Sequence, residues 1–161
     1  MIFVTDRDVE DLMRAEELTG KIASGGWDSL DTSEQGEWLA GLKGCYNATD
    51  LERVDANTIT LAAMLRAVAI PITIQPYSGW GRNSFPVPSQ MERIRSNIIA
   101  LRGALQMPQD APAVPANLDY MDIAKANAIE RIQEIVYTLL AAQPRLQPRV
   151  YVLRAGEGMR I

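Results

Sequence analysis

One short stretch, residues 37–51 with the sequence EWLAGLKGCYNATDL, constrains the fold of this chain more than any other. Gly44 stands where a helix C-terminus favours a residue that tolerates positive φ. Thr49 and Glu52 then have the spacing of a capping box, which predicts that a second helix begins there. Three apolar side chains precede the turn on one helical face: Trp38, Leu39 and Leu42. We therefore expect a corner between two helices.

Apolar residues recur at helical spacing along most of the chain, and further capping-box spacings mark where helices begin. The stripe of the fourth helix is narrow and close to a coiled-coil seam, which suits packing against another helix. The pattern predicts helices over residues 6–23, 33–43, 50–69, 90–106 and 122–142.

Two short segments change to the alternating pattern of a β-strand. In residues 70–75 isoleucines alternate with other residues, and residues 149–154 form the only obvious partner. Prolines at 71 and 76 would confine such a strand to a sheet edge or a very small sheet. The expected fold is therefore mainly α-helical, with about five helices, a helical core and a small two-stranded β element. The length of 161 residues predicts a single domain over residues 1–161.

The composition offers little for catalysis. Histidine is absent, which removes the commonest general base and the commonest neutral metal ligand. Cys45 is the sole cysteine, so no disulfide forms within the chain, and we interpret it as a small buried hydrophobe. Asp119 and Asp122 are interpreted as helix caps rather than paired acids. We expect no enzymatic activity, no cofactor and no metal site.

The net charge of −4 is unevenly distributed. Residues 1–56 carry 13 acidic and 5 basic side chains, a net charge of −8, whereas residues 57–161 carry 7 acidic and 11 basic ones, a net charge of +4. A chain polarised in this way can stack head to tail with copies of itself, or its charges can simply be solvated. The isoelectric point near 4.9 argues against a nucleic-acid partner. The N-terminal MIFVTDRD does not have the pattern of a signal peptide, and no window suits a membrane span.

Two segments are candidate contact surfaces. The first is the irregular loop over residues 77–88, whose aromatic residues either form an exposed platform or pack against the end of the helical layer. We favour the packing interpretation. The second is the arginine-rich C-terminal segment. The candidate partner-contact residues are Tyr77, Trp80, Arg82, Phe85, Arg149, Tyr151 and Arg154.

The sequence of the corner between the two helices resembles that of a small domain of virion proteins from phages and prophages of Gram-positive bacteria. The likeness is specific at the corner and continues as the order of elements over nearly the whole chain. Sixteen residues carry it: Glu37, Trp38, Leu39, Ala40, Gly41, Leu42, Lys43, Gly44, Tyr46, Asn47, Ala48, Thr49, Asp50, Leu51, Arg53 and Val54.

The resemblance implies a structural module of the phage tail or baseplate, with no catalytic residues to transfer. Its expected location is the virion, with assembly in the host cytoplasm. The expected partners are other virion proteins and copies of this chain. Because the chain is short, an adaptor or decoration is favoured over a hub. The alternative is a carbohydrate-binding module for host attachment, which would stack a host glycan on Tyr77 and Trp80.

Overall fold

The computed structural model describes residues 1–81 and 84–142, and five α-helices account for most of them. The predicted strand over residues 149–154 and the candidate residues Arg82, Arg149, Tyr151 and Arg154 lie outside the described residues. The elements in order are α1 (Val9–Gly25), the 3-10 helix η1 (Trp27–Ser29), α2 (Thr32–Ala40), α3 (Ala48–Ala67), α4 (Pro88–Gly103) and α5 (Ile123–Ala141). The mainly helical prediction is thus confirmed.

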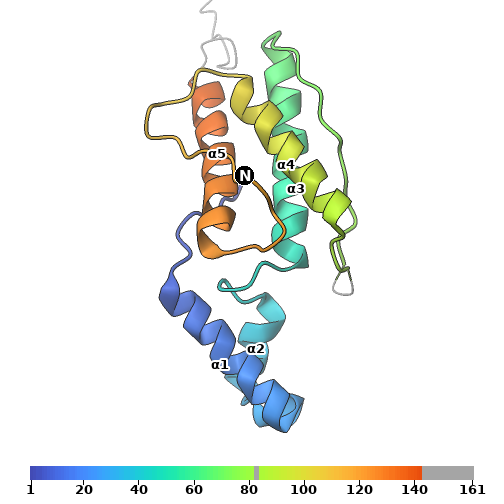
Figure 1. Ribbon diagram of the computed structural model, residues 1–161, viewed down its shortest axis with the longest axis vertical. Coiled ribbons are helices and arrows are strands. Elements are labelled where there is room, and N and C mark those ends of the chain that lie inside the picture. Colours follow the sequence, from blue (N-terminus) through green and yellow to red (C-terminus); the bar gives the residue numbers. More distant parts are fainter. Residues whose placement is uncertain (82–83, 143–161) are drawn as a thin grey trace, which may run out of the picture.

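Helices α3, α4 and α5 pack against one another as a three-helix bundle (Figure 1). Their apolar stripes meet along a single core, which continues to Trp80 in one connection and Leu118 in the other. Each helix contributes side chains with almost no exposed surface, among them Leu61 of α3, Ile98 of α4 and Ile132 of α5. The helical periodicity of the sequence is therefore the direct cause of this bundle.

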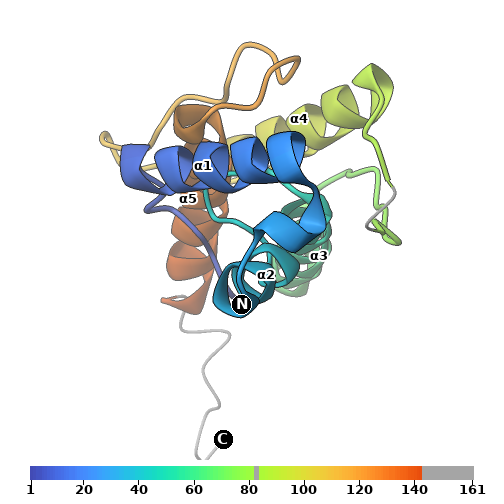
Figure 2. The same cartoon turned by 90° about the horizontal axis from the view of Figure 1, so that it is seen from below.

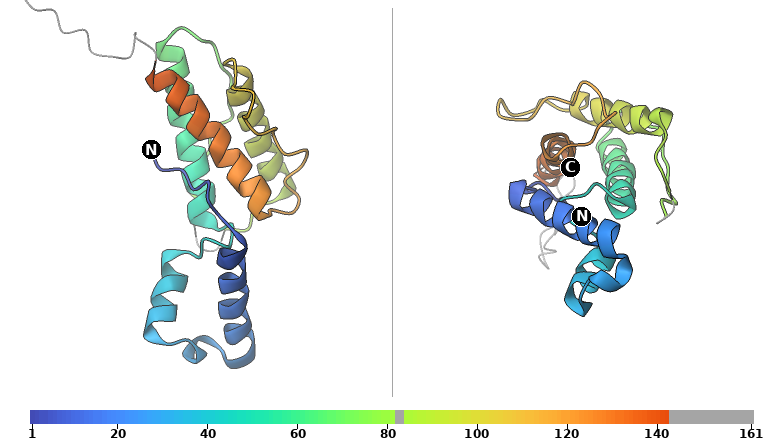
Figure 3. Two further views of the ribbon diagram at one scale, coloured as in Figure 1. Left: turned by 90° about the vertical axis from the view of Figure 1, so that its left-hand side faces the viewer. Right: turned by 60° about the horizontal axis from the view of Figure 1, so that its bottom comes forward.

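The first two helices form a separate hairpin at one end of the bundle, and we call residues 9–43 the arm (Figures 1 and 3). Seen from below, α1 lies across that end of the bundle (Figure 2). The arm has a small core of its own, in which Ala15, Leu18, Leu30 and Leu42 are buried. The protein therefore has two hydrophobic clusters of very different size.

Three helices begin at caps other than the predicted ones: the observed cap lies upstream in α2 and α3 and downstream in α1. The capping box of α3 is Asn47 with Asp50, not Thr49 with Glu52. In α1 and α2 the N-caps are aspartates, Asp8 and Asp31. The capping-box spacings of the sequence, Thr5 with Asp8 and Thr32 with Gln35, had predicted threonines. Asparagine and aspartate cap at least as well as threonine, so spacing alone does not choose between neighbouring candidates.

The predicted two-stranded β element is wrong for the part of the chain that the structure describes, because no strand occurs there. Residues 70–75 instead run as an extended segment beside the bundle, with Ile70 and Ile72 packed against its core. Side chains satisfy its backbone: Asn97 accepts a hydrogen bond from the Gln75 amide at 2.8 Å and donates one to the Gln75 carbonyl at 2.8 Å. Alternating apolar residues thus reflect packing on helices rather than pairing in a sheet.

Gly44 does not end the first helix of the corner as predicted, because Gly41 does so. Gly41, with φ 96°, is the residue that ends α2 in a left-handed conformation. Gly44 is needed for a close approach, because a Cβ atom there would lie 2.1 Å from the carbonyl oxygen of Asp11. The absence of a side chain at Gly44 lets α1 lie directly on the corner.

Candidate functional site

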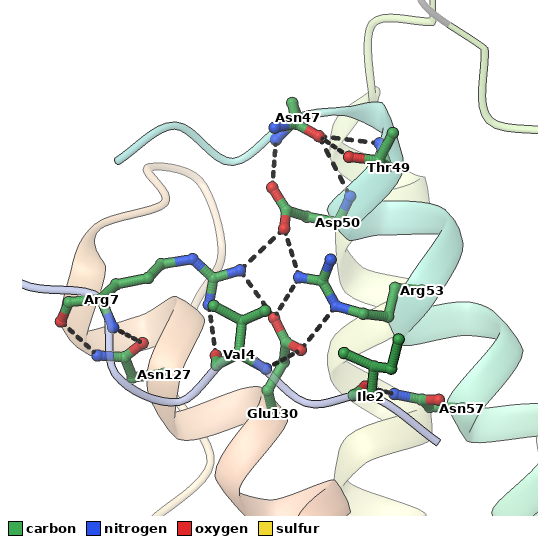
Figure 4. A network of polar contacts seen from close by, with 10 residues as sticks. All are labelled: Ile2, Val4, Arg7, Asn47, Thr49, Asp50, Arg53, Asn57, Asn127 and Glu130. Carbon is green, nitrogen blue, oxygen red and sulfur yellow. Dashed lines mark hydrogen bonds and ion pairs between the residues drawn. The ribbon is translucent and has the colours of Figure 1, made fainter. Parts of the chain in front are cut away.

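The N-terminal segment, residues 1–8, is held between α3 and α5 by hydrogen bonds to their side chains (Figure 4). The Val4 amide donates to Glu130 Oε2 at 2.8 Å. Asn127 accepts from the Arg7 amide at 3.1 Å and donates to the Arg7 carbonyl at 2.8 Å. Asn57 donates to the carbonyl of Ile2 at 2.9 Å. Residues at opposite ends of the described chain are thereby joined just before α1 begins.

Four charged side chains meet at this place, and we call them the ionic joint: Arg7, Asp50, Arg53 and Glu130. Arg7 Nη2 donates to Asp50 Oδ1 at 2.9 Å and to Glu130 Oε1 at 2.8 Å. Arg53 donates to both oxygens of Glu130, at 2.9 and 2.8 Å, and also pairs with Asp50. Figure 4 shows the two guanidinium groups and the two carboxylates converging from three segments of the chain.

The joint is neutral as a whole, and three of its four side chains are buried. Glu130 is 0% exposed, Arg7 5% and Asp50 6%. Burial opposes the charge of Arg53, yet its bonds to Glu130 and Asp50 hold its pKa above the ordinary value. Because removing charges from water is costly, such a set is weak evidence for stability, but the loss of one member leaves an uncompensated charge inside the protein.

The corner motif supplies much of this joint. The two carboxylate oxygens of Asp50 have different partners. One accepts a hydrogen bond from the Asn47 amide at 2.9 Å in the cap of α3, and the other pairs with Arg7 and Arg53. The Tyr46 ring lies 5.7 Å from the Arg7 guanidinium carbon, and burial is the main cause that raises the pKa of its hydroxyl well above the ordinary value. The residues that carry the resemblance therefore fix how the arm leaves the bundle.

The aromatic loop over residues 77–88 is held by another buried acid, Asp55. Trp80 is only 8% exposed, and its indole Nε1 donates to Asp55 Oδ2 at 2.7 Å. Arg93 binds the same carboxylate with two hydrogen bonds of 2.7 Å. Tyr77 packs edge-on against Trp80, with ring centroids 4.9 Å apart, and the Arg93 guanidinium lies 5.1 Å from the Tyr77 ring. Glu52 accepts from the amides of both Gly79 and Trp80 at 3.0 Å.

The structure thus separates the candidate contact residues that it describes. Trp80 packs into the core, as the favoured interpretation expected, and its ring is not available as a stacking platform. Tyr77 is 36% exposed, whereas Phe85 is 87% exposed. The glycan alternative needed an exposed Trp80, so that argument for it does not hold.

Sequence reasoning missed the buried acids Asp55 and Glu130 and their partners Arg7 and Arg93. Glu130 lies 123 positions from Arg7, so no local spacing connects them. The available signal was an acid within an otherwise apolar helical stripe: Asp55 follows Val54 in α3, and Glu130 follows Ile129 in α5. A charged residue at such a position is almost never buried without a partner.

Cys45 lines two of the cavities that adjoin the corner. One, of about 350 Å³, lies between α1 and the start of α5 and is lined by Leu12, Met121 and Ile123 among others. The other, of about 340 Å³, is lined by Trp38, Leu42 and Ala48 among others. Burial raises the pKa of the Cys45 thiol. Within residues 1–81 and 84–142, no group of three acids or cysteines is placed to hold a metal ion.

No helix in the described part of the chain is long and apolar enough to cross a membrane. Comparison with models of protein families, with curated proteins and with solved structures finds no match for this chain.

Proposed function

We propose that this chain is a structural protein of a phage particle, an adaptor in the tail or baseplate that works through protein–protein contacts. The observation that carries the proposal is that two residues behind the resemblance, Asp50 and Arg53, make up half of the ionic joint. Arg53 binds Glu130 directly, and Asp50 is linked to Glu130 through Arg7. A motif used in this way sets geometry rather than performing chemistry.

The joint suits an adaptor because it requires one arrangement of the arm. Buried ion pairs of this kind are better known for specifying a particular structure than for adding stability. The hydrogen bonds in the joint have directions that only one placement of the N-terminal segment satisfies, among them Val4 to Glu130 and Arg7 to Asn127. A fixed angle between arm and bundle would let the protein place two neighbours at a set distance.

Exposed apolar side chains on both parts supply places for such neighbours. Val9 and Met13 of the arm are 65% and 63% exposed, and Phe85 and Tyr120 beside the bundle are 87% and 85% exposed. Aromatic and other large apolar side chains are the usual anchors of protein interfaces. An interface of ordinary size would cover roughly 800 Å² on each partner.

The proposal is tested on particles purified from the phage or prophage that encodes the chain. Quantitative mass spectrometry should find the protein in intact particles at a fixed ratio to the major tail protein, and in tails separated from heads. If the protein is abundant in the lysate but is removed from particles by density-gradient purification, the proposal is wrong.

A matched pair of variants connects the proposal to the joint. Glu130→Gln removes a joint charge, whereas Glu134→Gln, one turn along α5, changes a carboxylate that pairs with Arg131 outside the joint. We expect particles assembled with Glu134→Gln to incorporate the protein normally and those with Glu130→Gln to incorporate several-fold less. Equal incorporation would show that the joint does not matter for assembly.

A further inference from the structure

We propose that the outer face of α1 is a docking surface for the C-terminal segment, residues 143–161, of a second copy of this chain. The copies would then associate head to tail. This inference rests on the proposed function in one respect, namely that the chain acts by binding protein.

The docking face consists of the exposed apolar residues at the start of α1. Val9 and Met13 are 65% and 63% exposed and Leu12 is 36% exposed, and the three lie within an arc of about 100° at the spacing of an α-helix. Leu18, which faces the arm's own core, is nine positions from Val9 and so points about 180° away. Leu12 also lines the cavity of about 350 Å³ beside Met121 and Ile123, which extends the apolar surface toward α5.

The surroundings of this face are strongly acidic. The arm contains eight acidic and three basic residues, a net charge of −5. All three cations are used within the arm or its base: Arg14 pairs with Glu37, Lys21 with Glu34, and Lys43 with Asp11. In the part of the chain that the structure describes, Glu10 and Glu16 have no basic partner. Glu10 lies at the side of the apolar face, and Glu16 lies on the same face two turns along the helix from Val9. The face therefore joins apolar surface to uncompensated negative charge.

The C-terminal segment has the complementary composition. Residues 143–161 contain four arginines and one glutamate, a net charge of +3. Its apolar run of residues 150–153, VYVL, is bracketed by Arg149 and Arg154. An apolar run with a cation at each end matches an apolar face that has one acid on it and one beside it, and complementary charge favours both specificity and fast association.

The position of α5 favours a second copy over the chain's own arm. Ile123, at the start of α5, lines the cavity beside α1, whereas Ala141 ends the helix about 27 Å away. Figure 1 shows the end of α5 and the arm at opposite ends of the molecule. To reach its own arm, the segment would have to turn back along the whole bundle and close a long loop, which costs entropy. The arm of a copy stacked end to end requires no such return. Head-to-tail contacts of this kind build rings or filaments.

Charge reversal in the full-length protein tests the inference. The first variant carries Glu10→Lys and Glu16→Lys, the second carries Arg149→Glu and Arg154→Glu, and the third carries all four substitutions. Light scattering at low salt should show association of the wild type, and both two-site variants should have dissociation constants at least tenfold higher. The four-site variant, and a 1:1 mixture of the two-site variants, should associate again. Asp110→Lys, which reverses an exposed charge in a connection far from α1 in sequence, is the control and should associate like the wild type.

The inference is overturned if the wild type is a monomer at every salt concentration, if either two-site variant associates normally, or if the four-site variant fails to recover. A wild-type monomer whose hydrodynamic radius grows on charge reversal would mean that the segment binds its own chain. None of these results removes the protein from purified particles, so a failure of this inference is distinguishable from a failure of the proposed function.

Discussion

The bundle and the arm are both built from helices, but different forces hold them. The bundle buries large aliphatic side chains from three helices, with Leu61, Ile98 and Ile132 completely inaccessible. The arm buries four apolar residues, and ion pairs at its surface supplement them: Arg14 with Glu17 and Glu37, and Lys21 with Glu34. Exposed ion pairs contribute little stability. The difference suggests that the bundle is a stable platform and the arm a weaker unit that depends on the joint.

The largest effect is expected from breaking the joint. Glu130→Ala leaves Arg7 and Arg53 with only one of the two carboxylates that they share and therefore leaves a net positive charge in the joint, so the free energy of unfolding should fall by about 3–5 kcal/mol. Urea titration followed by circular dichroism measures this change. The control Glu134→Ala removes a partly exposed partner of Arg131 and should cost less than about 1 kcal/mol. Similar values for the two variants would contradict the role given to the joint.

A cavity created in the core of the arm should show whether the arm and the bundle unfold independently. Leu18 is 0% exposed, so Leu18→Ala should lower the free energy of unfolding by about 2–5 kcal/mol. Because the core of the arm is small, a loss of this size should open the arm. We expect amide protection to disappear from α1 and α2 and to remain in α3 to α5. Leu61→Ala, at an equally buried position of the bundle, should instead lower protection everywhere. If Leu18→Ala weakens the bundle as much as the arm, the two regions unfold together and the comparison fails.

A smaller effect is expected where the arm rests on the corner. The Cβ atom of Gly44→Ala would meet the Asp11 carbonyl, which is backbone and cannot rotate away, so α1 must shift at a cost of about 1–3 kcal/mol. Gly36→Ala in α2 is the matched control, because nothing lies within 4 Å of the added atom. That substitution should stabilise the arm by about 0.5–1 kcal/mol through helix propensity. Thermal unfolding of both variants tests this; a Gly44→Ala protein as stable as wild type would show that the close approach is not required.

Acid should weaken the arm before the bundle. Arg14 and then Lys21 hold the pKa of Glu17 below its ordinary value of 4.5, and Lys21 does the same for Glu34. A carboxyl whose pKa is lower in the folded state binds fewer protons there, so this stabilisation is complete above about pH 4.5 and is lost as the pH falls further. Amide spectra recorded from pH 7 to 3 should therefore show α1 and α2 loosening first. An arm that becomes more stable on acidification would refute this reading of the ion pairs.

The sequence predicted the bundle better than the arm's attachment, and the reason is locality. The apolar stripes of α3, α4 and α5 repeat within each helix, so periodicity reveals them. The joint depends on a contact between Arg7 and Glu130, which are 123 positions apart, and no pattern within one segment of the sequence indicates that contact. The predicted strand failed for a related reason. The alternation in residues 70–75 was real, but Asn97 of α4 satisfies the Gln75 backbone where a second strand was expected.

The aromatic loop shows the same limit at the candidate contact residues. Composition identified Tyr77, Trp80 and Phe85 together, but only the fold shows that Trp80 binds Asp55 inside while Phe85 stays exposed. An aromatic residue in a loop serves equally well as a core residue or as a surface anchor, and the sequence around it does not decide between them.

Hydrogen exchange of the wild-type full-length protein at neutral pH tests the central claim most directly. If the joint attaches a weak arm to a stable bundle, amides of α3, α4 and α5 should share the slowest exchange, and those of α1 and α2 should exchange at least about tenfold faster, a difference of about 1.4 kcal/mol in opening free energy. Equal protection in all five helices would show one cooperative unit and would contradict the account.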